Sequence, residues 1–515
     1  MAEEPSNHTD ISGERRRVRV KSGLLEGKAA NGVWEFMGIP YAEPPIGELR
    51  WAPPQPVKPW RGVRPCAQFG ESCAQPDGAA YQLGRLGEDC LYMNIWIPEN
   101  KAHESLPVMV WIHGGAFLSG SASIELRPGA RLYDGGRLAE RGVIVVTINY
   151  RLGPFGFLAH PLLSAQSPRH VSGNYGMLDQ IAALKWVAEN IEAFGGDPSR
   201  VTLFGQSAGA VSIYLLMLST LSARLFCRVI CQSGPLWIKS GLPPPYQDLR
   251  AAQETGEALA GALGCGDSLR AIDIMRTLPE DDVIKAAGLE GGLTPQSLPF
   301  GPVVDGWVLQ HRPESLFSRA RQHKIDLLAG WTLQEADYFM NLFDVSPAGY
   351  ESYMRQMAGS HKEEALALFP IEETSLREVF AAAVTAFDFE APVRFVARCL
   401  EEAGNRSFLY MFTRVPPGPE GQDLCACHGS EIPYVFGDVE DETYYGLIDL
   451  HLSDHILEYF TNFARNGDPN SPGLPPWPSF DYESEPVLQL GDEITVKSFP
   501  HKEACDLAER IHRDL

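Results

Sequence analysis

Long hydrophobic runs are missing from this sequence of 515 residues. Its most apolar stretch, residues 143–148, is far shorter than the roughly 20 residues that a membrane-spanning helix needs, so we expect no membrane partner. Positive charge is also scarce, because 43 Lys and Arg residues stand against 66 Asp and Glu residues, for a formal net charge of -23. Such a chain repels phosphate backbones, so we expect no nucleic-acid partner.

The N-terminus lacks the apolar core of a secretory signal, since residues 1–17 are polar. We therefore expect a flexible segment over residues 1–17 and a cytoplasmic location. The 10 cysteines include no CxxC pair, and the tight cluster of Cys425, Cys427 and His428 does not have the two-armed spacing of a zinc site. We expect no bound metal.

The sequence does contain enough apolar material for a large core, with 44% hydrophobic residues. From about residue 106 onward, continuous apolar runs alternate with helical patterns. Buried strands separated by helices are typical of a mostly parallel sheet covered on both faces, so we predict an α/β fold. The predicted strands are residues 107–113, 142–150, 201–204, 228–231, 325–329 and 407–412, and the helices include residues 178–194 and 208–218.

Helix-rich stretches separate the later strands. Those at roughly 245–300 and 345–402 are long enough to be insertions that form a helical cap over one edge of the sheet. We therefore predict that residues 18–515 form a single domain with two cap segments.

A candidate nucleophile lies where an apolar strand meets a helix. Residues 205–209 read Gly-Gln-Ser-Ala-Gly and fit the pattern G-x-S-x-G, in which a sharp turn lifts the serine Oγ clear of the backbone. The glycines are needed because side chains there would clash with neighbouring elements. A capping serine in an ordinary glycine-rich turn is the alternative, but the flanking strand and helix favour Ser207 as a nucleophile.

A serine nucleophile also needs donors for the oxyanion that forms during its attack. Residues 113–117 (His-Gly-Gly-Ala-Phe) follow the first long strand, where an oxyanion loop belongs in a sheet of this kind. Small residues let backbone N–H groups approach a tetrahedral oxyanion. A plain glycine turn would explain the glycines, but not their pairing with the Ser207 motif.

Further ordered runs carry a family resemblance. They are residues 36–42 (FMGIPYA), 88–94 (EDCLYMN), 149–153 (NYRLG) and 194–198 (FGGDP). With these runs the sequence resembles the type-B carboxylesterases, the cholinesterase-like branch of the α/β-hydrolases, and its pattern is closest to microbial carboxylesterases such as p-nitrobenzyl esterases. The resemblance covers most of the chain and implies an α/β-hydrolase fold.

The resemblance assigns roles to single residues. Ser207 corresponds to the nucleophile, Glu335 in the run 330–335 (GWTLQE) to the triad acid, and His428 in the run 428–433 (HGSEIP) to the base. The order Ser…Glu…His is that of the α/β-hydrolase fold. In such a triad the imidazole activates the serine and the acid orients the imidazole. The implied oxyanion hole consists of Gly115, Ala116 and Ala208.

Weaker assignments follow from the same resemblance. Ser233 and Glu431 match buried polar residues that could orient His428, or they are simply satisfied polar groups. Cys73 and Cys90 match the positions of a family disulfide: both would stay reduced in a cytoplasmic protein, and a bridge between them is the alternative under oxidising conditions. Phe300, Phe339 and Phe343 are candidates for the substrate pocket, and ordinary core packing is the alternative for each.

Together these assignments predict a serine carboxylic-ester hydrolase that forms an acyl-enzyme, needs no metal or organic cofactor and acts on small to medium esters. The Gly-Gly-Ala-x loop resembles that of family members that accept esters of bulky alcohols. Gln206 replaces an acidic residue by which cholinesterases favour cationic substrates. Two alternatives stay open: a carbamate or amide hydrolase of the same fold, and a non-catalytic binding module. The oligomeric state is not predicted.

Overall fold

The computed structural model describes residues 11–12, 15–76, 83–101, 105–127, 130–238, 244–266, 268–290, 294, 297–371, 375–417, 425–441 and 444–513. The segment expected to be flexible, residues 1–17, lies largely outside the described residues. Its described part is extended, because β1 (Ile11–Ser12) pairs antiparallel with β2 (Arg15–Val20). Residues 15–17 thus differ from our expectation: side chains of β2 alternate inward, and Arg16 is buried with the valines that follow it.

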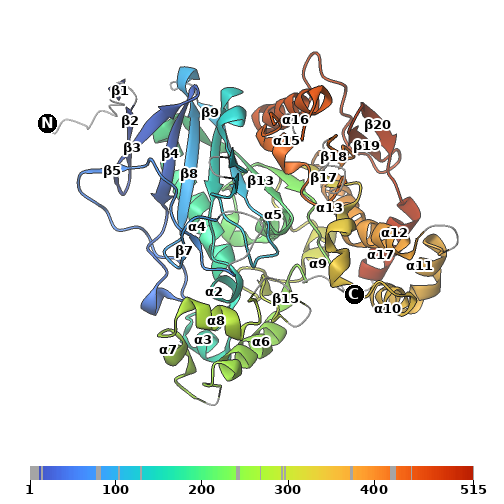
Figure 1. The fold of residues 1–515 in the computed structure, drawn as a ribbon, viewed down its shortest axis with the longest axis horizontal. Helices are drawn as coiled ribbons and strands as arrows, with labels where there is room; N and C mark the ends of the chain where they lie inside the picture. The colour runs from blue at the N-terminus through green and yellow to red at the C-terminus, as the bar shows by residue number, and fades with distance from the viewer. Residues whose placement is uncertain are drawn as a thin grey trace.

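The described strands form one large sheet whose centre is parallel (Figure 1). From edge to edge its strands are β1, β2, β3 (Gly23–Ala30), β4 (Val33–Pro40), β8 (Tyr92–Pro98), β12 (Ile144–Ile148), β9 (Leu106–Ile112), β13 (Gly196–Gln206), β14 (Arg228–Gln232), β17 (Asp326–Thr332), β18 (Ser407–Phe412), β19 (Pro486–Leu490) and β20 (Ile494–Ser498), with β5 (Val63–Pro65) beside β3. The strands from β12 to β19 in this order run parallel, and antiparallel strands continue the sheet at both edges. The predicted mostly parallel α/β fold is confirmed.

Helices cover the sheet and extend beyond one of its edges (Figure 1). They are α1 (Gly136–Glu140), α2 (Gly153–Phe157), α3 (Pro161–Gln166), α4 (Tyr175–Asn190), α5 (Ala208–Leu218), α6 (Leu249–Ala262), α7 (Ala271–Met275), α8 (Glu280–Ala286), α9 (Pro313–Ser318), α10 (Pro347–Ala358), α11 (Lys362–Leu368), α12 (Leu376–Val384), α13 (Ala391–Glu402), α15 (Ile432–Phe436), α16 (Leu447–Asn466) and α17 (Lys502–Arg513). Short strands pair outside the sheet: β6 (Ser72–Cys73) with β7 (Leu86–Gly87), β10 (Glu125–Arg127) with β11 (Ala130–Arg131), and β15 (Gln247–Asp248) with β16 (Val303–Val304). No described helix is long and apolar enough to cross a bilayer.

The two segments expected to form a cap both contain helices. The first holds α6, α7 and α8, which gather beside α3, and the second holds α10 to α13, of which α11 and α13 contact α17 (Figure 1). In Figure 1 the first group lies at the bottom of the view and the second at its lower right.

The apolar core lies on both faces of the sheet, because side chains of a strand alternate between faces. In β9, Val108, Val110 and Ile112 belong to the core under α4 and α5, whereas Met109 and Trp111 belong to the core under α15 and α16. Each of these five side chains is fully buried. A continuous apolar run such as β9 is therefore the pattern of a strand covered on both faces.

The strand register brings the candidate site residues together at the carboxyl ends of the central parallel strands. Gly205 of β13 pairs with Ile112 of β9, and Gln206 pairs with Gln232 of β14. Gln232 in turn pairs with Gly330 of β17. The carboxyl ends of these parallel strands therefore meet, and the loops that follow them converge, as is usual for ligand sites in α/β sheets.

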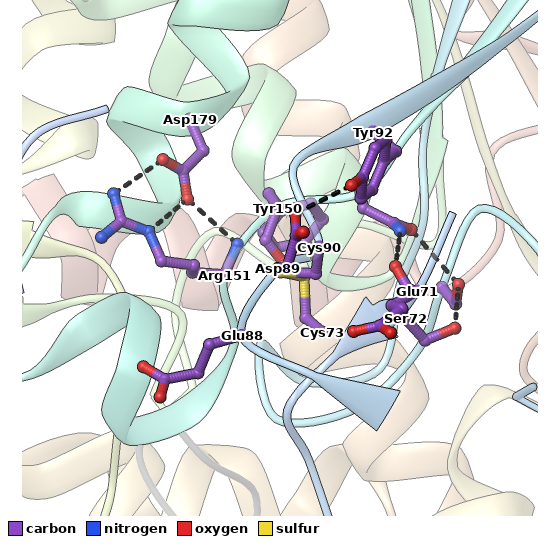
Figure 2. The surroundings of a disulfide bond; sticks show 12 residues. Glu71, Ser72, Cys73, Glu88, Asp89, Cys90, Tyr92, Tyr150, Arg151 and Asp179 are labelled. Carbon is purple, nitrogen blue, oxygen red and sulfur yellow. Dashed lines mark hydrogen bonds and ion pairs between the residues drawn. A yellow bond between two sulfur atoms is a disulfide. The ribbon is translucent and has the colours of Figure 1, made fainter. Parts of the chain in front are cut away.

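A disulfide joins Cys73, at the end of β6, to Cys90, which precedes β8 (Figure 2). The Cα atoms of the two residues are 4.8 Å apart, and the sulfur of Cys73 lies 3.0 Å from the carbonyl oxygen of Tyr150. The bridge thus lies against the loop that follows the parallel strand β12. Disulfides are typical of oxidising compartments, whereas the cytoplasmic location expected above would keep both thiols reduced.

Candidate active site

The candidate nucleophile lies on a strained turn between β13 and α5. Ser207 has φ 57° and ψ -126°, a conformation that side-chain-bearing residues rarely adopt and that persists only where surrounding structure holds it. Its N–H donates to the carbonyl oxygen of Gln232 at 2.8 Å. A Cβ on Gly205 or Gly209 would lie 2.7 or 2.0 Å from the carbonyl oxygen of Ile112, so neither glycine has room for a side chain. The two glycines thus let the turn pass close to β9.

The candidate acid and base meet although 93 residues separate them. Their loops are joined by a backbone hydrogen bond in which Gln334 N–H donates to the carbonyl oxygen of Ala426 at 3.0 Å. Glu335 is fully buried, and its Oε2 lies 2.5 Å from Nδ1 of His428, while Oε1 accepts from Thr332 N–H at 2.8 Å. Because a carboxylate only accepts, Nδ1 carries the proton and Nε2 keeps its lone pair free to accept one.

The Nε2 atom of His428 faces the turn that carries the nucleophile. It lies 3.0 Å from the side-chain amide nitrogen of Gln206, the residue before Ser207. With Nδ1 protonated, the amide donates this hydrogen bond and Nε2 accepts it. Sequence reasoning missed this contact, because it treated Gln206 only as the loss of a negative charge.

The expected oxyanion loop passes directly beside the nucleophile. A Cβ on Gly114 would come within 3.0 Å of Ser207 Cβ. Within the part of the chain that the structure describes, the N–H groups of Gly115 and Ala116 donate to no backbone oxygen. Ala208 opens α5, and the N–H of a first helical residue has no partner in a preceding turn. Donors from two different elements thus lie near Ser207.

Ser233 and Glu431 are buried, but no hydrogen bond among the described residues joins either of them to His428. Ser233 follows β14 with φ 52°, and its Oγ has no hydrogen-bond partner among the described residues. Burial and the negative charge of Glu335 raise the pKa of Glu431 to about 8, although two backbone N–H groups oppose the shift. Glu431 is therefore largely protonated at neutral pH and adds little negative charge to that of Glu335.

This protonation state predicts how Glu431→Gln behaves. Glutamine resembles the protonated carboxyl, so we expect little change in kcat/KM near neutral pH. A carboxyl whose pKa rises on folding, here from 4.5 to about 8, binds more protons in the folded state and weakens the fold as pH rises through that window. As pH rises through that window, the free energy of unfolding of the wild type should therefore decrease relative to that of Glu431→Gln, by on the order of a few kcal/mol. Denaturant unfolding at both ends of the window measures this, and identical pH profiles for the two proteins would contradict it.

Aromatic rings surround the base. The ring centroids of Phe339 and Phe389 lie 4.8 and 5.4 Å from that of His428, and the ring of the exposed Tyr338 lies 6.3 Å away. The pocket candidate Phe339 is thus next to the base. Phe389 was missed, because it lies within the helical segment of residues 385–390, where no motif marks it.

The other two pocket candidates lie in different surroundings. Phe343 packs on Phe380 with ring centroids 5.2 Å apart, and no ring contact links it to the base in the described residues. Phe300 is buried in the core, and a Cβ on the neighbouring Gly301 would lie 3.8 Å from the ring of Phe117 in the oxyanion loop. The structure thus puts Phe300 near that loop and Phe343 in the packing of the second cap segment.

Within the cluster of Cys425, Cys427 and His428, the histidine contacts Glu335. Among the described residues, no group of three or more His, Cys, Asp and Glu side chains could hold a metal ion.

Known proteins resemble the chain over most of its length. The model of the carboxylesterase family matches residues 14–508. Fumonisin B1 esterase of Sphingopyxis macrogoltabida is 34% identical over 492 residues, which cover 92% of this chain and 86% of that protein. Para-nitrobenzyl esterase of Bacillus subtilis (strain 168) is 34% identical over 502 residues, covering 94% of this chain and 97% of that protein. A solved structure of a PNB esterase has a TM-score of 0.83 and 33% identity, covering 96% of this chain and 99% of its own.

Proposed function

Since the chain belongs to the carboxylesterase family, it is a serine carboxylic-ester hydrolase, and we propose that Ser207, His428 and Glu335 are its catalytic triad. The observation that carries this assignment is the 2.5 Å contact between Glu335 Oε2 and His428 Nδ1. That contact leaves Nε2 unprotonated and facing the turn of the nucleophile. An acid, a base and a serine in this relation form the constellation that activates a hydroxyl for acyl transfer.

In the first half-reaction, Ser207 Oγ attacks the ester carbonyl carbon while its proton passes to His428 Nε2. For this transfer Oγ takes the place of the Gln206 amide at Nε2, so substrate binding has to break that hydrogen bond. The imidazolium that forms is stabilised by the carboxylate of Glu335. His428 then gives the proton to the leaving alcohol oxygen, the ester C–O bond breaks, and the acyl group stays on Ser207.

The negative charge of each tetrahedral intermediate rests on the former carbonyl oxygen. In our proposal the N–H groups of Gly115, Ala116 and Ala208 donate to it, and the loss of one such donor typically costs about 3 kcal/mol. In the second half-reaction water gives its proton to His428, attacks the acyl carbon and releases the acid. The Ser207 Oγ then recovers a proton from His428.

The test of the proposed triad is hydrolysis of p-nitrophenyl esters, from acetate to laurate, by the purified chain. We expect release of p-nitrophenol, and the acyl length with the highest kcat/KM measures the size of the acyl pocket. Trapping the enzyme during turnover should place the acyl group on Ser207 by mass spectrometry. Acylation of another residue would overturn the assignment of the nucleophile.

The oxyanion loop supports a proposal about the alcohol part of the substrate. Residues 114–117 read Gly-Gly-Ala-Phe, and by this Gly-Gly-Ala-x form the loop resembles that of family members that accept esters of bulky alcohols. We therefore expect measurable turnover of tert-butyl acetate, followed by titration of the acetic acid released. The control is n-butyl acetate, which has the same acyl group and a linear alcohol of the same carbon count. Turnover of the linear ester alone would contradict this prediction.

A further inference from the structure

The oxyanion loop has an unusual backbone. Gly115 and Gly120 have φ 108° and 113°, and between them Ala116 and Phe117 have φ 54° and 62°. Two consecutive residues with side chains in the left-handed region form a strained segment. Such a segment keeps its shape only where surrounding groups hold it. The placement of the Gly115 and Ala116 N–H groups therefore depends on what anchors the loop.

The start and the middle of the loop have clear anchors. At the start, Tyr150 O–H donates to the carbonyl oxygen of His113 at 2.9 Å, and the rings of the two residues stack with centroids 4.5 Å apart. In the middle, Gly153 N–H donates to the carbonyl oxygen of Phe117 at 2.7 Å. Both anchors come from the segment that follows β12.

Gly120, at the end of the loop, is held by a side chain from a distant segment, and the next two residues form hydrogen bonds with Ser72 and Asn149. Gln75 is 3% exposed, and its Oε1 accepts from Gly120 N–H at 2.8 Å, while its Nε2 donates to the carbonyl oxygen of Gly120 at 2.9 Å. The same nitrogen donates to the carbonyl oxygen of Cys73, also at 2.9 Å. Both amide hydrogens and the amide oxygen are thus used, and Gly120 is paired through both its N–H and its C=O, as in a strand ladder.

Gln75 is itself fixed in place by covalent structure. It follows Cys73 by two residues, and Cys73 is bridged to Cys90 and lies against Tyr150 (Figure 2). Tyr150 is also the residue that anchors the start of the oxyanion loop. The two ends of the loop are therefore tied to one buried cluster around the disulfide.

We propose that Gln75 is a positioning residue for the oxyanion hole, which it holds in shape through Gly120. This inference rests on the proposed function of Gly115 and Ala116 as oxyanion donors. Donors act on the oxyanion only when they point at the place where charge develops. A loop released at Gly120 would let those N–H groups shift, which weakens binding of the transition state more than binding of the ester.

The experiment compares Gln75→Met with the wild type and with the control Gln55→Met, which changes an exposed glutamine in the same way. Methionine keeps the length of the side chain but makes none of the three hydrogen bonds. We expect kcat for p-nitrophenyl acetate to fall about 10- to 100-fold in Gln75→Met, because a misplaced donor loses much of its effect, with KM nearly unchanged. Gln55→Met should match the wild type.

A second readout separates positioning from general damage. Ser207 adds to the carbonyl carbon of an aryl trifluoromethyl ketone, its proton passes to His428, and the carbonyl oxygen becomes an oxyanion in the hole. The corresponding trifluoromethyl alcohol binds without forming this adduct. Gln75→Met should weaken inhibition by the ketone by the same factor as kcat, and inhibition by the alcohol by far less. Equal weakening of both inhibitors, or wild-type inhibition by both, would overturn the proposal.

Two further measurements keep the proposal testable if Gln75→Met does not fold. Gln75→Glu retains an oxygen that accepts from Gly120 N–H and loses the amide donor, so its kcat should fall below that of the wild type with KM nearly unchanged, and an unchanged kcat would count against the proposal. In the wild type, hydrogen exchange of the Gly120 amide should be slow, because Gln75 Oε1 accepts its hydrogen. Fast exchange in folded enzyme would overturn the proposed role of Gln75. A wild type that is inactive would refute the proposed function itself, whereas an active wild type with an equally active Gln75→Met refutes only this inference.

Discussion

Replacing Ser207 with alanine is expected to lower kcat for p-nitrophenyl acetate by about a millionfold, the scale seen when a triad nucleophile is removed. The variant keeps the oxyanion donors and the base but cannot form the acyl-enzyme. Since Ser207 lies on a turn with φ 57°, alanine has to adopt the same strained conformation. Thermal unfolding should therefore be measured beside activity, to show that the variant is folded.

The matched control is Ser212→Ala in α5, the helix that follows Ser207. Ser212 is fully buried, whereas Ser207 is only partly buried, and the Ser212 Oγ accepts from Gln180 Nε2 at 3.0 Å. Among the described residues no hydrogen bond joins it to Glu335 or His428. Its loss should cost roughly 1 kcal/mol of stability and leave kcat close to that of the wild type. Residual activity in Ser207→Ala above a few per cent of wild type would identify another nucleophile, and the acyl-enzyme mechanism through Ser207 would be wrong.

Glu335→Gln is expected to lower kcat by about ten-thousandfold, the effect of replacing a triad carboxylate with its amide. The amide nitrogen would face the Nδ1 of His428, and an N–H donor there favours the tautomer that carries its proton on Nε2. That tautomer cannot accept the proton of Ser207. The loss should appear in kcat for every ester tested, because it concerns the base rather than any one substrate.

The comparison with Glu431→Gln makes this prediction specific. Both carboxyl groups are buried, and both substitutions replace an oxygen with an NH2 group. Only Glu335 contacts the imidazole, whereas the raised pKa of Glu431 leaves it largely neutral near pH 7. A large loss in Glu335→Gln with a small one in Glu431→Gln supports the assignment of the acid. Equal losses would show that burial of the carboxyl, rather than contact with His428, determines the rate.

The local parts of the fold were predictable, because their patterns lie within a few residues. The predicted helix at residues 208–218 coincides with α5, and the predicted strand at residues 407–412 coincides with β18. The strand predicted at 201–204 is longer, since β13 runs from Gly196 to Gln206, and Gly196 pairs with Leu106 of β9 before a register shift that ends at Val201. The C-terminal strands β19 and β20 were not predicted at all.

The candidate site was predictable only where a motif marks it. The patterns around Ser207 and Gly115 predict a nucleophile and an oxyanion loop, but Glu335 and His428 have no local signature and were assigned through a family resemblance. The contact of Gln206 with His428 and the approach of Phe389 arise from how distant segments pack. The same holds for the pairing of Gln75 with Gly120. Side-chain contacts between loops cannot be read from spacing along the chain.

The parallel register has a consequence for how the enzyme acquires activity during folding. The proposed triad comes from the ends of β13 and β17 and from the loop after β18, and parallel neighbours can pair only through long crossover connections. Contacts between residues far apart in sequence form slowly, because the loops between them must first be closed. Helices such as α5 can form early without any catalytic competence. Recovery of esterase activity after dilution from denaturant therefore reports the pairing of the parallel strands that carry the proposed triad. A chain that ends before residue 428 lacks the proposed base.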